Sequence, residues 1–314
     1  ESTIPFPPTV ANGLIYLVSG NTLDALDARS GHTLWAEQHE YASWSPIVEN
    51  GLVYVVAGNQ INNTSMLYAL DATSGQQKWS HQEATVTHQP AVANGLVYVV
   101  SDDLTSTAYT LHRTVSALDA ASGQEKWSYQ VENDPAPGSN LSFFFTLLVA
   151  NGRVYVEIIF FSDETHGSTT LYAFDALSGH LIWNEPGISN NQAYPALANG
   201  LIYIYSTNGN VYALDARSGQ QKWFHNAVPF GNSPLWPEPD PVAANDIISQ
   251  GLIYVGTNDG ILHALDARSG REKWSYQIGG FLTPPAVSNG IVYMYGSHNL
   301  EAIQPPAGAP SFSL

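Results

Sequence analysis

Residues 117–127 read A-L-D-A-A-S-G-Q-E-K-W, one copy of the pattern A-x-D-A-x-S-G-x-x-x-W. The pattern occurs six times, and its copies end at Trp35, Trp79, Trp127, Trp183, Trp223 and Trp274. A second phrase, N-G-x-[IV]-Y or a close variant, occurs seven times and ends at Tyr16, Tyr54, Tyr98, Tyr155, Tyr203, Tyr254 and Tyr293. Repeats of about 45 residues are typical of propellers and solenoids. The chain is therefore expected to fold as an array of similar units.

Each repeat is predicted to be a four-stranded antiparallel sheet. In the repeat that begins at Pro90, a short apolar strand leads into Asn94-Gly95, a strong signal for a tight turn. Residues 96–100 are apolar at every position, which predicts a strand buried on both faces. A third strand ends in D-A-A-S-G, where Asp and Ser side chains are expected to bond the turn backbone, and a fourth carries Trp127. A meander of four strands is one propeller blade.

These phrases resemble the pyrroloquinoline-quinone (PQQ)-type repeat family, whose blades each carry A-x-D-x-x-[ST]-G-x-x-x-W. The resemblance covers nearly the whole chain and implies a β-propeller in which each Trp docks against the neighbouring blade. The enzymes of this family, the quinoprotein dehydrogenases, are much longer and hold quinone and calcium beside a vicinal cysteine pair. Relatives closer in size are a periplasmic lipoprotein scaffold for outer-membrane protein assembly and extracytoplasmic sensor parts of bacterial membrane proteins, including Ser/Thr kinases.

The strand count predicts how the array ends. Seven first, second and third strands are readable, but only six tryptophan strands. We therefore predict an all-β fold, with residues 1–314 forming one seven-bladed β-propeller whose ring is closed by a terminal strand. Either Glu1–Pro5 or Ser311–Leu314 is expected to supply that strand, because an unpaired edge promotes aggregation. The blades are placed at about residues 6–40, 41–84, 85–135, 140–188, 189–228, 240–279 and 280–304.

The composition argues against several function classes. Ten basic and 27 acidic residues give a net charge of −17, which disfavours nucleic acid and anionic membranes as partners. The chain has no cysteine, so it has no disulfide, thiolate metal site or thiol nucleophile. No stretch approaches the ~20 apolar residues of a membrane span, so direct membrane insertion is not expected. The first residues include neither an initiator Met nor a signal peptide, which indicates a mature or excised form.

Loop lengths predict the working face of the molecule. The turns between first and second strands and between third and fourth strands are short and uniform, and all insertions fall in the other loops. Function usually lies on variable loops held by a rigid scaffold. Residues that precede the inner strands on this face differ between blades and are expected to ring the mouth of a central channel, as a site or as a packed plug. The candidate ligand-binding residues are Trp44, His88, Phe145, Tyr194, Asp246 and, on a proline-rich loop, Trp236.

No catalytic chemistry is readable from the motifs. The chain has no H-E-x-x-H, G-x-S-x-G or phosphate loop, and its ten histidines are scattered, with nearly all expected on exposed turns or strands. No catalytic residue, metal site or cofactor is predicted, and PQQ with calcium is disfavoured because the family's cysteine pair is missing.

We expect a non-catalytic, monomeric module that binds a protein, a peptide or a small polar ligand, on an extracytoplasmic (periplasmic or cell-surface) bacterial protein. The alternative is an enzyme, either a quinone-dependent oxidoreductase or a hydrolase or lyase, with its site at the channel mouth.

Overall fold

The chain folds into strands in a computed structural model, which describes residues 7–38, 44–59, 64–86, 88–103, 112–131, 145–161, 167–189, 193–206, 210–226, 248–256, 260–279, 285–288, 290–296 and 299–304. Within these ranges every regular element is a strand. The same ranges therefore hold no helix long and apolar enough to cross a membrane.

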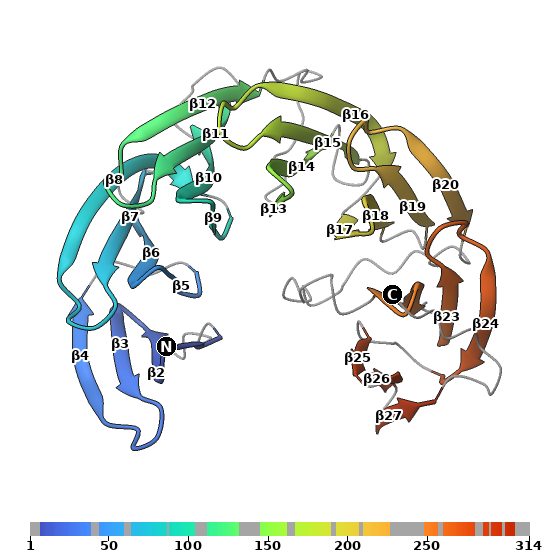
Figure 1. Cartoon of the computed structure of the whole chain (residues 1–314), viewed down its shortest axis with the longest axis horizontal. Coiled ribbons are helices and arrows are strands. Elements are labelled where there is room, and N and C mark those ends of the chain that lie inside the picture. Colours follow the sequence, from blue (N-terminus) through green and yellow to red (C-terminus); the bar gives the residue numbers. More distant parts are fainter. Residues whose placement is uncertain are drawn as a thin grey trace. The chain divides into compact units, whose positions relative to one another are not determined.

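The strands follow the sequence repeats in chain order, and the repeats are numbered accordingly (Figure 1). Repeats 1 and 2 are β1 (Thr9–Ala11), β2 (Leu14–Ser19), β3 (Thr22–Asp27), β4 (Thr33–Gln38), then β5 (Ile47–Glu49), β6 (Leu52–Asn59), β7 (Thr64–Asp71) and β8 (Gln77–Val86). Repeats 3 and 4 are β9 (Ala91–Ala93), β10 (Leu96–Asp103), β11 (His112–Asp119), β12 (Glu125–Val131), then β13 (Phe145–Ala150), β14 (Arg153–Phe161), β15 (Gly167–Asp175) and β16 (Leu181–Ser189). Repeats 5 and 6 are β17 (Ala193–Ala198), β18 (Leu201–Ser206), β19 (Asn210–Asp215), β20 (Gln221–Asn226), then β21 (Ile248–Ser249), β22 (Leu252–Gly256), β23 (Ile261–Asp266) and β24 (Glu272–Gln277). The described part of repeat 7 is β25 (Ala286–Ser288), β26 (Ile291–Gly296) and β27 (Asn299–Ile303).

The predicted four-stranded antiparallel sheet is confirmed in most repeats. Repeats 1, 4, 5 and 6 each form a sheet of four strands in chain order, and the described strands of repeat 7 form a sheet of three. Repeats 2 and 3 differ, because they share one eight-stranded sheet. Strand β8 continues past its own repeat, so that Val86 pairs with Ser101 and Thr85 with Asp102 of β10.

One register recurs and places the conserved phrases side by side. In repeat 3, Tyr98 lies opposite Ala117, and Ala117 lies opposite Trp127, with a bulge directly after Ala117. A small residue between two large rings leaves room for both, and ring centroids of Tyr98 and Trp127 are 6.1 Å apart. The alanine of the phrase therefore serves the packing of its own sheet.

The tryptophan also joins its sheet to the next repeat. The Trp79 indole N–H donates to the Ala120 carbonyl oxygen at 3.0 Å, and the Tyr54 hydroxyl donates to the same oxygen at 3.1 Å. A Cβ on Gly123 would lie 2.6 Å from Trp79 Cε3, and the φ of Gly123 is +71°. Glycine is thus required at this turn both by conformation and by the ring that lies on it.

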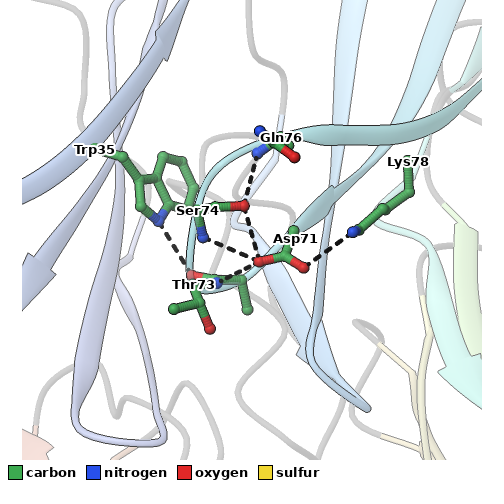
Figure 2. Close-up of polar contacts among 7 residues, drawn as sticks. Trp35, Asp71, Thr73, Ser74, Gln76 and Lys78 are labelled. Carbon is green, nitrogen blue, oxygen red and sulfur yellow. Dashed lines mark hydrogen bonds and ion pairs between the residues drawn. The ribbon is translucent and has the colours of Figure 1, made fainter.

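The aspartate of the phrase organises the turn, as predicted. Figure 2 shows Asp71 accepting hydrogen bonds from the Thr73 and Ser74 backbone N–H groups at 3.1 and 3.0 Å and from the Ser74 hydroxyl at 3.0 Å. Lys78 Nζ lies 3.1 Å from its other oxygen. These donors, led by the Ser74 N–H, lower the pKa of Asp71 to about 2. The recurring carboxylates are therefore occupied by their own turns.

The chain forms two compact units, one of residues 1–163 and 172–182 and the other of residues 164–171 and 183–314. In the first unit, β10 is buried on both faces, as predicted: Val97 and Val99 pack with Trp79, and Tyr98 and Val100 pack with Val156. In the second unit, the two faces of β22 are buried likewise. Ile253 and Val255 pack against repeat 5, and Tyr254 packs against repeat 7.

Candidate functional site

The insertions gather at one edge of each sheet, here called the loop edge. It is the edge where the first strand begins, the second ends, the third begins and the fourth ends. In repeat 3 the pairs Tyr98–Ala91 and Asp103–His112 place the start of β9 and both ends of the 104–111 insertion there. The opposite edge carries the uniform turns, such as Asn94-Gly95, in which both residues have positive φ. The predicted division between long loops and short turns is therefore reproduced by the described strands.

Two of the candidate residues meet at the loop edge of repeats 2 and 3. Trp44 precedes β5 and His88 precedes β9, and their rings pack edge to face with centroids 5.9 Å apart and planes at 76°. The next residues are also joined, because the Gln89 side-chain amide donates to the Ser45 carbonyl oxygen at 3.2 Å. Trp44 packs against the hydrophobic cluster shared by repeats 2 and 3. The pair is thus held on the scaffold by packing and by a hydrogen bond between neighbouring segments.

The electrostatics of this pair are those of a neutral site. Burial lowers the pKa of His88 to about 4, so its imidazole is uncharged at neutral pH. The Trp44 indole N–H is shielded from solvent and has no acceptor among the described residues. A buried donor without a partner is uncommon in folded proteins. The pair therefore offers an aromatic surface with one unused hydrogen-bond donor, whereas so weak a base suits acid–base catalysis at neutral pH poorly.

The structure leaves the other candidates without a described side chain. Phe145 is the first residue of β13, opposite Ile158, and Tyr194 lies in β17, opposite Tyr205, which places their backbones near the loop edges of repeats 4 and 5. Their side chains lie outside the described part of the chain, as do Trp236 and Asp246 altogether.

A buried ion pair at the same edge escaped sequence analysis. Arg113 Nε lies 3.3 Å from Asp102 Oδ1 across the β10–β11 ladder, and both side chains are almost fully buried. Burial raises the pKa of Asp102 although Arg113 opposes that shift. Beside it, Glu83 of β8 accepts a hydrogen bond from the Ser101 hydroxyl at 3.2 Å and lies 3.5 Å from His81. Charged groups are thus concentrated where β8 joins β10.

A histidine–carboxylate contact also departs from the sequence prediction. His263 was expected on an exposed strand, but it is only 7% exposed, and its Nδ1 lies 2.7 Å from Glu272 Oε2. This contact lowers the pKa of Glu272. Among the described residues no group of three or more His, Asp or Glu side chains is arranged to hold a metal ion. The described donors therefore do not fit a calcium–quinone centre, and no chemistry is derived through one.

The repeated sheets, the Tyr–Ala–Trp register and the Trp–Gly contacts define a class of protein, the β-propellers built from PQQ-like repeats. The crystal structure of BamB from Moraxella catarrhalis supports this fold, with a TM-score of 0.58 at 20% identity over 90% of this chain and 79% of that chain. The family model described as outer membrane protein assembly factor BamB (PQQ_2) matches residues 4–225 and 244–305. The chain belongs to this family.

Curated relatives match shorter stretches. The outer membrane protein assembly factor BamB of Moranella endobia is 28% identical over 169 residues, which is 40% of this chain and 43% of that protein. The quinoprotein ethanol dehydrogenase of Pseudomonas aeruginosa is 32% identical over 106 residues, 33% of this chain and 15% of that protein. The chain thus matches less than half the length of either relative.

Proposed function

We propose that the chain is a non-catalytic scaffold that binds a protein partner through its loop edges. One observation carries the proposal: Trp44 and His88 form a preorganised aromatic pair, with an unused indole donor, at the edge where the insertions lie. Tryptophans held in place by their neighbours dominate the binding energy of many protein interfaces. Membership of a family described by outer membrane protein assembly supports a protein rather than a small polar ligand.

The partner chemistry follows from the pair. A neutral imidazole beside an indole favours apolar side chains, and the N–H of Trp44 favours a backbone carbonyl. We expect an extended protein segment that presents an apolar side chain next to a free carbonyl. Phe145, Tyr194, Asp246 and Trp236 remain the further contact residues in this proposal. The net charge of −17 adds an electrostatic preference for a partner of low negative charge.

The proposal includes the finer architecture expected from the sequence. The whole chain would form one monomeric seven-bladed propeller, with blades at the boundaries given above and a terminal strand closing the ring. It would act outside the cytoplasm, in the periplasm or at the cell surface, where outer membrane proteins are assembled. No cofactor would be needed for binding.

A binding screen tests the proposal. The folded protein is panned against a displayed library of random peptides, and the selected peptides are measured against Trp44→Ala and His88→Ala variants. We expect both variants to keep the wild-type melting curve within a few degrees and to lose about tenfold or more in affinity. Selection of no peptide, or undiminished affinity in both variants, would contradict it. Trp79→Ala is the matched control, because it should lower stability without a specific effect on binding.

An enzyme is the second candidate function, and one observation favours it: the likeness to a quinoprotein ethanol dehydrogenase. Dye reduction that depends on added PQQ, calcium and an alcohol would select this reading over the scaffold.

A further inference from the structure

Repeat 1 has a sheet face that lacks the cover found on its counterparts. In repeats 2 and 3 the positions equivalent to Ile15, Leu17 and Leu26 are no more than 2% exposed: Val53, Val55, Leu70, Val97, Val99 and Leu118. Ile15, Leu17 and Leu26 are themselves partly exposed. Because the strands are otherwise alike, the difference shows that this face of repeat 1, here called the rear face, has no partner among the described residues.

The turn of repeat 1 shows the same contrast in detail. In repeats 2 to 6 the turn glycine lies under a tryptophan, with a Cβ on Gly75, Gly123, Gly179, Gly219 or Gly270 falling 2.8 Å or less from an indole atom. Gly31 has the same positive φ, +71°, but no described atom within 4 Å of its Cβ position. Ala72 and Ala120, whose carbonyls accept the indole bonds, are buried, whereas Ala28 is exposed. The rear face therefore carries a formed notch of the kind that receives an aromatic ring.

Repeat 7 has the complementary need. Tyr293 lies opposite Ala302 in the recurring register, yet Ala302 is exposed, whereas its equivalents Ala25, Ala69 and Ala117 are 0% exposed. Leu300 on the same strand is 69% exposed. In the described part of repeat 7 there is no fourth strand to pair with β27.

The sequence after β27 contains a degenerate copy of the eleven-residue phrase. Residues 302–312 read A-I-Q-P-P-A-G-A-P-S-F, which keeps the first Ala, the Gly at position seven and an aromatic residue at position eleven. Phe312 is followed by Ser313, as Trp79, Trp127 and Trp274 are followed by serine. Applied to this copy, the register Ala117–Trp127 sets Phe312 opposite Ala302, and that of Val115–Tyr129 sets Leu314 opposite Leu300.

We propose that Ser311–Leu314 is the fourth strand of repeat 7 and that Phe312 occupies the Gly31 notch of repeat 1. The segment would bury Leu300 under Leu314, place a ring on Gly31 and cover Leu26. Phenylalanine lacks an indole N–H, so the Ala28 carbonyl would keep its bond to water, which accounts for the loss of the tryptophan at this copy alone. The inference rests on the seven-repeat arrangement proposed above and is independent of what the loop edges bind.

Hydrogen exchange of the unmodified chain gives the first test. We expect the amides of 311–314 to exchange about a hundredfold or more slowly than unstructured peptide, at any protein concentration. Unprotected 311–314 amides would overturn the proposal. So would protection that depends on concentration, which indicates a second copy on the rear face, or protection of residues 1–5 in their place.

A double-mutant cycle gives the second test and separates docking from turn strain. Gly31→Ala is combined with Phe312→Ala, and Gly20→Ala is the matched control, since Gly20 lies in the same repeat with φ +60° and no atom within 4 Å. We expect Phe312→Ala to lower the melting temperature by several degrees and to abolish the part of the Gly31→Ala loss that exceeds the Gly20→Ala loss. Equal effects of Gly31→Ala in both backgrounds would refute the contact. Neither readout uses a binding partner, so failure here leaves the proposed function untouched.

Discussion

At the scale of single residues, the recurring phrase is a set of contacts and not a row of reactive groups. Trp79 fills the space above Gly123 and bonds the Ala120 carbonyl, while Asp119 bonds its own turn and Lys126. Each polar atom that suggests chemistry in the sequence is thus used by the framework. What remains available is where repeats differ, as at Trp44 and His88.

The fit of Trp79 on Gly123 gives the first prediction. Gly95→Ala and Gly123→Ala both place a side chain at positive φ, which costs about 1–3 kcal/mol each. Only Gly123 also meets an indole, so its variant should lose about 1–3 kcal/mol more through overpacking. Urea unfolding measures both, and Trp79→Ala, with an expected loss of about 3–5 kcal/mol, sets the scale. Equal losses at the two glycines would show that the ring does not limit the turn.

The low pKa of His88 gives a prediction about acid. Its native pKa of about 4 lies below the unfolded value of about 6.5. The unfolded chain therefore binds the proton more readily, and the stability present above pH 6.5 is lost as the pH falls towards 4. Thermal unfolding at several pH values should show a shallower decline in this window for His88→Gln than for the wild type. Parallel curves would mean that His88 is not desolvated by Trp44 and the surrounding strands.

At the scale of elements, register makes some contacts predictable and leaves others out of reach. Once Tyr98 is set opposite Ala117, counting along the two strands sets Asp102 opposite Arg113, so this ion pair was readable from the sequence. The Trp44–His88 contact was not, because it depends on how two inner strands lie beside each other. The extension of β8 onto β10 was also hidden, since no repeat phrase marks the end of that strand.

The Asp102–Arg113 pair gives a prediction at this scale. Removing one partner leaves a buried charge, so Asp102→Ala should cost about 3–5 kcal/mol. Replacing both by apolar residues, Asp102→Leu with Arg113→Met, should recover most of that loss because no charge then stays buried. Chemical unfolding of the three variants checks the order. A double variant as unstable as Asp102→Ala would show that the pair is needed for more than its charges.

At the scale of the whole molecule, a fold signal and a function signal separate. The six tryptophan phrases predict the propeller-type sheets because every copy performs the same packing task. They carry no information on activity, since relatives with the same phrases include an assembly factor and an alcohol-oxidising enzyme. Function must therefore be argued from positions where copies diverge.

That separation leads to the last prediction, which concerns the cofactor for which the repeat is named. The chain has no cysteine to pair beside a quinone, and its described acidic residues are dispersed among turns, with Asp71, Asp119 and Asp215 each bonded to a lysine. We expect no saturable change in the near-ultraviolet and visible absorbance of PQQ when the folded protein is added with calcium, and no gain in melting temperature. Any ligand that binds only the native chain must raise that temperature as its concentration exceeds Kd, so the two readouts check each other. A stoichiometric complex with alcohol-dependent dye reduction would replace the scaffold by an enzyme.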